Sequence, residues 1–176
     1  MVTKMLRRVC AGLSLSALAL PLLVASALLG TPVQAAEQSL DDMFAGAQKA
    51  LNSGQNREAI RILSRAQQAA PNDAEVLLLR ARAYTSDGDY TRALADATRA
   101  IELKPNDPEM YLARARVYRA DDKYPNALTD VEKAVSLAPN NPDVYLSRAD
   151  IHRDMGNDAA ADADEKKAEE LENAAR

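Results

Sequence analysis

The chain has 176 residues, 47% of them hydrophobic and 27% charged, with one Cys, one His and no Trp. A single Cys cannot form an internal disulfide, and one Cys with one His cannot supply the usual number of ligands for zinc. The 22 basic and 26 acidic residues give a net charge of -4, whereas general nucleic-acid-binding proteins carry a basic surplus. The composition therefore argues against disulfide-rich, zinc-binding and nucleic-acid-binding proteins.

Residues 1–35 have the layout of a secretory signal peptide. Three basic residues precede an apolar run over residues 9–30, and the small residues Val33 and Ala35 suit cleavage after Ala35. The run approaches the roughly 20 residues that span a bilayer, so a retained anchor is the alternative, against which Pro21 argues. We expect a periplasmic protein without stable membrane insertion after cleavage, while a secreted or signal-anchored form stays open.

The rest of the sequence repeats with a period of 34 residues. The period is marked by Pro71, Pro105 and Pro139. The repeats align without gaps, and residues 36–39 form a lead-in before the first of them. The alignment predicts four copies of one structural unit, at residues 40–73, 74–107, 108–141 and 142–175. Alanine recurs in three columns: Ala47, Ala81, Ala115 and Ala149; Ala59, Ala93, Ala127 and Ala161; and Ala66, Ala100, Ala134 and Ala168.

Each unit is predicted to be a helix, a turn and a second helix. Asp73, Asp107 and Asn141 are residue types that cap helix starts, and Pro108 and Pro142 suit the first helical position, where no amide hydrogen bond is lost. Second helices are expected to begin near residues 91 and 125. The turn between the helices falls in one column: Gly54, Gly88, Asp122 and Gly156.

The 34-residue period, the alanine columns, Gly88-Asp89-Tyr90 at a turn and the closing proline resemble the tetratricopeptide repeat (TPR). The resemblance implies an all-α, right-handed superhelical solenoid of four helix-turn-helix units that binds other proteins. The fourth unit departs from the pattern, with Asp158 at the turn tyrosine and Glu165 at an apolar column. Its polar second helix is expected to cap the C-terminal end of the array.

Residues suited to catalysis are scarce. The sequence shows no phosphate-binding glycine loop, no cluster of metal ligands and no serine nucleophile motif. His152 stands in the column of Tyr84 and Tyr118, so we interpret it as a packing residue. We predict no catalytic residues, no cofactor, no metal and no enzymatic activity, which disfavours a small hydrolase or metalloenzyme.

Arginine and aspartate recur together, which suggests a structural ion pair within each repeat. The first repeat carries Gly46 and Ile62 at the two columns, so both partners are absent there at once. A guanidinium and a carboxylate can form two parallel hydrogen bonds. The expected pairs are Arg80 with Asp96, Arg114 with Asp130, and Arg148 with Asp164.

The resemblance implies that the first helices line a concave groove, where three columns at helical spacing share one face. An apolar floor would hold Phe44, Leu78, Leu112 and Leu146, beside an acidic margin at Asp41, Glu75, Glu109 and Asp143. A basic band would hold Arg82, Arg116, Arg119 and Arg153. Such a band could select a partner, or it could simply keep the surface soluble.

These patterns predict a non-enzymatic scaffold or adaptor of the bacterial cell envelope that binds a peptide or helix of a partner protein. The alternatives are an envelope-assembly chaperone or recruiter, and a structural module that self-associates through the first repeat. The carboxylate clamp known in the family is not matched, because Leu79, Ala113 and Ser147 stand where its asparagine would be.

Overall fold

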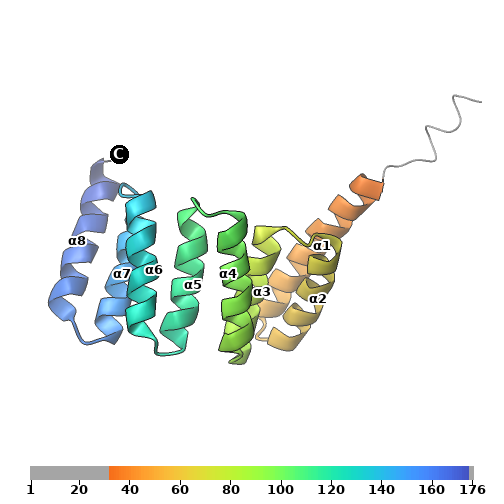
Figure 1. Cartoon of the computed structure of the whole chain (residues 1–176), viewed down its shortest axis with the longest axis horizontal. Helices are drawn as coiled ribbons and strands as arrows, with labels where there is room; N and C mark the ends of the chain where they lie inside the picture. Colours follow the sequence, from red (N-terminus) through yellow and green to blue (C-terminus); the bar gives the residue numbers. More distant parts are fainter. Residues whose placement is uncertain (1–31, 175–176) are drawn as a thin grey trace, which may run out of the picture. The chain divides into compact units, whose positions relative to one another are not determined.

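The computed structural model describes residues 32–174, and every regular element in this part is an α-helix. The chain divides into two compact units, Met1–Gln38 and Ser39–Arg176, and the helical array belongs to the second. In chain order (Figure 1) the helices are α1 (Pro32–Asn52), α2 (Asn56–Ala69), α3 (Ala74–Asp87), α4 (Tyr90–Leu103), α5 (Pro108–Ala120), α6 (Tyr124–Leu137), α7 (Pro142–Asp154) and α8 (Asp158–Ala174).

The N-terminal boundary differs from the sequence expectation. Helix α1 begins at Pro32, so the predicted lead-in at residues 36–39 is helical. Proline is well tolerated at the start of a helix, and the Ala, Gln and Glu residues that follow it favour helix. Most of the predicted signal peptide, residues 1–31, lies outside the described residues. In the described part, none of the helices is long and apolar enough to cross a membrane.

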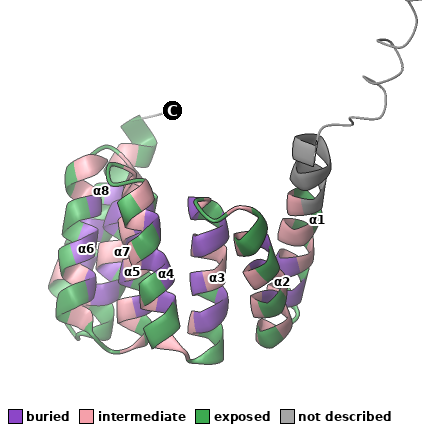
Figure 2. Ribbon diagram, turned by 45° about the vertical axis from the view of Figure 1, so that its right-hand side comes forward, coloured by how far each residue is buried: buried purple, intermediate pink, exposed green. Residues whose placement is uncertain are grey.

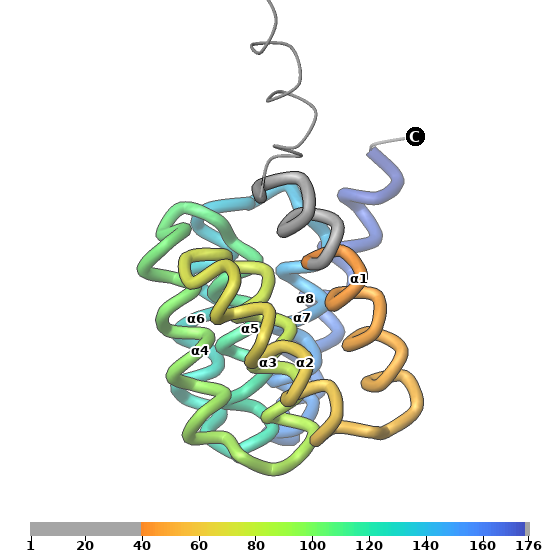
Figure 3. Tube along the Cα trace, turned by 90° about the vertical axis from the view of Figure 1, so that its right-hand side faces the viewer, coloured from red at the N-terminus to blue at the C-terminus, as the bar shows by residue number. Residues whose placement is uncertain are grey.

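The helices of the second unit form a row of hairpins in two layers. Helix α3 packs on α4, α5 on α6 and α7 on α8, while α2, α4 and α6 each contact the first helix of the next repeat. The first helices also touch one another, α3 with α5 and α5 with α7. Figure 3 views this row from the α1 end. The first helices therefore share one surface of the array, as the helix-turn-helix prediction requires.

The predicted N-caps and helix starts are confirmed. The side chain of Asp73 accepts hydrogen bonds from the amides of Glu75 (2.8 Å) and Val76 (3.2 Å), which no residue of α3 could satisfy. Asp107 and Asn141 cap α5 and α7 in the same way, each through an amide two residues on at 3.0 Å. Proline stands in the first turn of both helices.

The predicted turn column adopts the left-handed backbone conformation throughout. Three of its members are glycines, which enter this region without steric cost: Gly54, Gly88 and Gly156, with φ of 68°, 83° and 74°. The exception, Asp122, has φ of 54° and is the one non-glycine residue with positive φ in the described chain. Its carboxylate accepts a hydrogen bond of 2.8 Å from the Tyr124 hydroxyl. The turn geometry is thus the same with either residue type.

The core lies between the helices and contains the alanine columns. All twelve alanines of the three columns are buried. Larger apolar side chains such as Leu63, Val131 and Val144 fill the remaining space. In α8 the buried residues are Ala161, Asp164 and Ala168, which lie on one face, while most of the other residues are exposed (Figure 2).

We predict that Asp122→Gly is more stable than Asp122→Ala by about 1 kcal/mol, because only alanine carries a Cβ that strains a left-handed backbone. Both variants lose the contact with Tyr124, so the comparison isolates the backbone. Chemical denaturation of the two variants measures the difference. Equal midpoints and slopes for the two variants would contradict the assignment of strain to this turn.

Candidate functional site

The structure places the paired Arg and Asp columns in contact. In the second repeat, Arg80 Nε and Nη2 donate to the two carboxylate oxygens of Asp96 at 2.7 and 2.8 Å. Arg114 donates to Asp130 at 2.8 and 2.8 Å, and Arg148 to Asp164 at 2.8 and 2.6 Å. Each pair is bidentate and joins the first helix of a repeat to its second. The three aspartates are buried charged residues, Asp130 being 4% exposed.

Burial and hydrogen bonding define the electrostatics of these pairs. The hydrogen bonds from each guanidinium to its aspartate raise the pKa of Arg80, Arg114 and Arg148 above the usual arginine value. Arg114 additionally reaches Thr98 Oγ1 of the preceding repeat at 3.3 Å. The pair in the third repeat therefore also links neighbouring repeats.

The first repeat replaces the ion pair with an apolar contact. A Cβ placed on Gly46 would lie 3.7 Å from Cδ1 of Ile62, an ordinary van der Waals distance. The Ile62 side chain therefore lies close to the backbone of Gly46. In the first repeat, both columns thus carry uncharged residues that lie near one another.

His152 differs from the tyrosines of its column. Arg80 lies over the ring of Tyr84 and Arg114 over the ring of Tyr118, each at 5.9 Å from the centroid. In the fourth repeat, the equivalent Arg148 lies over Tyr145 instead, at 5.7 Å. His152 is half-buried, and its Nδ1 is buried without a hydrogen-bond partner among the described residues. Neither a nucleophile nor a carboxylate hydrogen-bonds to the ring in this part of the chain.

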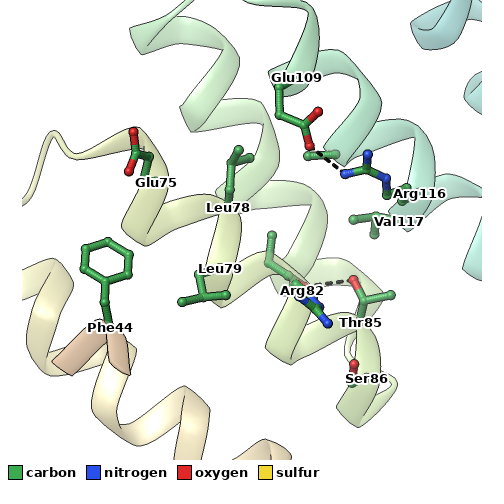
Figure 4. A pocket seen from close by; sticks show the side chains of 12 residues that line it. Phe44, Glu75, Leu78, Leu79, Arg82, Thr85, Ser86, Glu109, Arg116 and Val117 are labelled. Carbon is green, nitrogen blue, oxygen red and sulfur yellow. Dashed lines mark hydrogen bonds and ion pairs between the residues drawn. The ribbon is translucent and has the colours of Figure 1, made fainter. Parts of the chain in front are cut away.

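A pocket of about 380 Å³ opens on the surface formed by the first helices (Figure 4). Its walls come from α1, α3 and α5. We call it the Arg82 pocket. Its lining divides into an apolar set (Phe44, Leu78, Leu79, Ala81, Ala113 and Val117) and a polar set (Glu75, Arg82, Thr85, Ser86, Glu109 and Arg116). An apolar cavity edged by a few polar groups is the usual form of a recognition site.

The four residues of the predicted apolar floor lie in different surroundings. Phe44 and Leu78 are half-buried and line the Arg82 pocket. Leu112 is only 2% exposed, because Val131 of α6 and Val144 of α7 belong to the same core cluster. Leu146 is 40% exposed on α7. The four residues of the predicted apolar floor therefore differ in how accessible their side chains are.

The predicted basic band is largely neutralised by the protein's own acids. Arg116 Nη1 donates to Glu109 Oε1 at 2.7 Å, and Arg153 Nη2 donates to Glu165 Oε1 at 2.6 Å. Arg119 pairs with Asp150 at 2.8 Å and with Asp154, and hydrogen bonding to these acids raises its pKa.

Arg82 is the exception within the band. It is exposed and forms no ion pair with any side chain described in residues 40–174. Of the predicted acidic margin, Glu75 and Glu109 line the Arg82 pocket, and Asp41 and Asp143 do not.

The sequence interpretation missed part of the pocket lining. From the sequence, Leu79 and Ala113 are assigned only to positions of a clamp asparagine, and Val117 is assigned no role. Leu79, Ala113 and Val117 each lie one position after a residue of the predicted columns, on a neighbouring strip of helix surface. A wider apolar stripe, with i, i+3 and i+4 positions counted together, would have included Leu79 and Ala113.

Two family models, both described as tetratricopeptide repeat, match residues 44–108 and 108–141. Together they cover more than half of the chain. The chain belongs to the tetratricopeptide repeat family. The matched region ends before the fourth repeat, where the sequence departs from the family pattern. A comparison with curated proteins found no match.

Solved structures of other TPR proteins share this fold. MamA is 22% identical with a TM-score of 0.62, covering 76% of this chain and 78% of its own. The Sgt2 TPR domain from Aspergillus fumigatus is 20% identical with a TM-score of 0.60, and the match covers 66% of this chain and 79% of the Sgt2 chain. The first TPR of Spaghetti (RPAP3), solved bound to the HSP90 peptide SRMEEVD, is 24% identical with a TM-score of 0.58. The match covers 68% of this chain and 94% of the Spaghetti chain. At these identities the likeness concerns the fold alone.

We predict that Asp130→Ala lowers the free energy of unfolding by about 3 kcal/mol, because Arg114 is left without its buried counter-charge. The double variant Arg114→Ala/Asp130→Ile removes both charges, as Gly46 and Ile62 do in the first repeat, and should lose less stability than the single variant. Thermal or urea unfolding compares the two. An Asp130→Ala protein as stable as the parent would rule out a structural role for the pair.

Proposed function

We propose that this protein is a non-enzymatic interaction scaffold that binds a segment of a partner protein on the surface of its first helices. The observation that carries the proposal is the Arg82 pocket, which is apolar, open and walled by three successive first helices. An apolar pocket with a polar rim can hold an anchor side chain of a peptide or helix. The peptide-bound Spaghetti structure supports this use of the fold.

The described residues hold no competing catalytic arrangement. His152 lacks a hydrogen-bonded nucleophile or carboxylate, and the three buried aspartates are engaged by arginines. No group of three or more His, Cys, Asp or Glu in the described chain could hold a metal ion.

We further propose that the protein acts in the bacterial cell envelope. The support comes from the sequence of residues 1–35, with its basic start, apolar run and small residues before the expected cleavage point. A role as an envelope-assembly chaperone or recruiter is a version of the same proposal, in which the bound partner is a protein that is still being assembled in the envelope.

Expression of the full chain in a bacterial host tests the location. We expect the mature protein to begin at Ala36 and to be released with the periplasmic fraction by osmotic shock. Mass spectrometry of the purified protein reads the N-terminus directly. An unprocessed protein that stays in the membrane fraction would instead favour the retained anchor.

Photocrosslinking in intact cells tests the binding surface. A photoreactive residue at Leu78 lies in the Arg82 pocket, whereas the same residue at the exposed Arg65 on α2 serves as a control outside it. Leu112 is unsuitable, because its side chain is buried. We expect a discrete crosslinked protein from Leu78 and none from Arg65. The same products from both positions, or no product from Leu78, would contradict the proposed site.

A further inference from the structure

Four arginines were candidates for partner recognition, and the structure separates them into two groups. Arg116, Arg119 and Arg153 each hydrogen-bond to a carboxylate of the protein at 2.6–2.8 Å. A partner acid that bound one of these arginines would have to displace an existing counter-charge. Arg82 has no such counter-charge among the described side chains, and it is exposed in the pocket wall. A new carboxylate can therefore reach Arg82 without that cost.

The acids of the pocket do not neutralise Arg82. Glu109 is bound to Arg116, as the dashed line in Figure 4 shows. Glu75 precedes Arg82 by two helical turns of α3, which correspond to about 10 Å. Its nearest basic partner is Lys104, at 3.7 Å. The pocket is thus polarised along α3, with a basic group at the Arg82 end and an acid at the other.

Apolar surface adjoins Arg82 directly. Leu78 lies one turn before it on α3, and Val117 and Ala113 line the same pocket from α5. Pocket lining continues beyond Arg82 to Ser86, so the pocket does not end at the guanidinium. A bound chain can pass this point, and a side-chain carboxylate fits the geometry without the chain having to terminate there.

Resting on the proposed function, we infer that the Arg82 pocket binds a partner segment that places an apolar side chain on Leu78 and an adjacent Asp or Glu side chain on Arg82. The apolar anchor supplies burial, and the charge-assisted hydrogen bond selects the acidic neighbour. The protein carries a net charge of -4, so an accessible cation in the wall of the pocket favours an acidic group at this site over the surrounding surface. Arg82 is in this sense the specificity-determining residue of the site.

Selection from a random peptide library displayed on phage tests the inference with protein purified after expression of the full chain. Peptides fused through their C-terminus to the coat protein have no free terminal carboxylate, so an acidic preference comes from side chains. We expect the parent protein to enrich peptides with Asp or Glu at a fixed spacing from Leu, Ile or Phe. Arg82→Glu should instead enrich Lys or Arg at that spacing.

Two control variants separate the possible failures. Arg119→Gln removes an arginine of the same surface that already has acidic partners, so it should keep the acidic preference. Ala113→Trp fills the Arg82 pocket and should enrich no peptides above background. Circular dichroism and melting curves confirm that each variant is folded.

The strongest selected peptide is then synthesised with a fluorescent label and its Kd measured by anisotropy. Arg82→Gln, and exchange of the peptide acid for its amide, should each weaken binding about tenfold, with no further loss when combined.

Enriched peptides without an acidic preference, or a preference lost equally in Arg119→Gln, would overturn the inference and leave the binding site standing. Failure of the parent to enrich any peptide over Ala113→Trp would overturn the proposed function together with it.

Discussion

Close contact between helices through alanine is the constraint on which this structure depends. Alanines of all three columns are buried in every repeat, so each hairpin brings its helices together where only a methyl group fits. Larger side chains such as Leu63, Val131 and Ile151 are buried in the same core and fill the space that the alanines leave. Because one hairpin cannot bury its apolar face alone, the fold exists only as a stacked array. The surface of the first helices, with the Arg82 pocket, is a product of that stacking.

The buried ion pairs are compatible with the close packing of the helices. A buried aspartate such as Asp130 is tolerated because Arg114 satisfies both of its oxygens. The pairs use the arginines that face the second helices, so these side chains do not reach the pocket. Other arginines of the first helices are largely occupied by Glu109, Asp150 and Glu165. Specific recognition at the proposed site is therefore concentrated in very few groups.

Helix positions, caps and turns could be predicted from the sequence because each depends on a few neighbouring residues that recur every 34 positions. The start of α1 at Pro32 could not be predicted from the repeat pattern, because the 34-residue alignment begins at residue 40. Exposure within a column also escaped prediction. Leu78 and Leu112 are equivalent in sequence, yet Leu78 is half-buried in the wall of the Arg82 pocket, whereas Leu112 is only 2% exposed. Pairing of Arg119 with Asp150 depends on the packing of two repeats, which no single-repeat pattern contains.

The exchange of an ion pair for Gly46 and Ile62 in the first repeat has a consequence for how such an array can change. Both the Arg–Asp pair and the Gly–Ile pair are compatible with the fold. A single substitution that starts to convert one into the other leaves one buried charge without its partner. Duplication or deletion of a whole repeat carries both partners along and avoids that intermediate. The architecture thus permits changes in length more readily than piecemeal changes at these two columns.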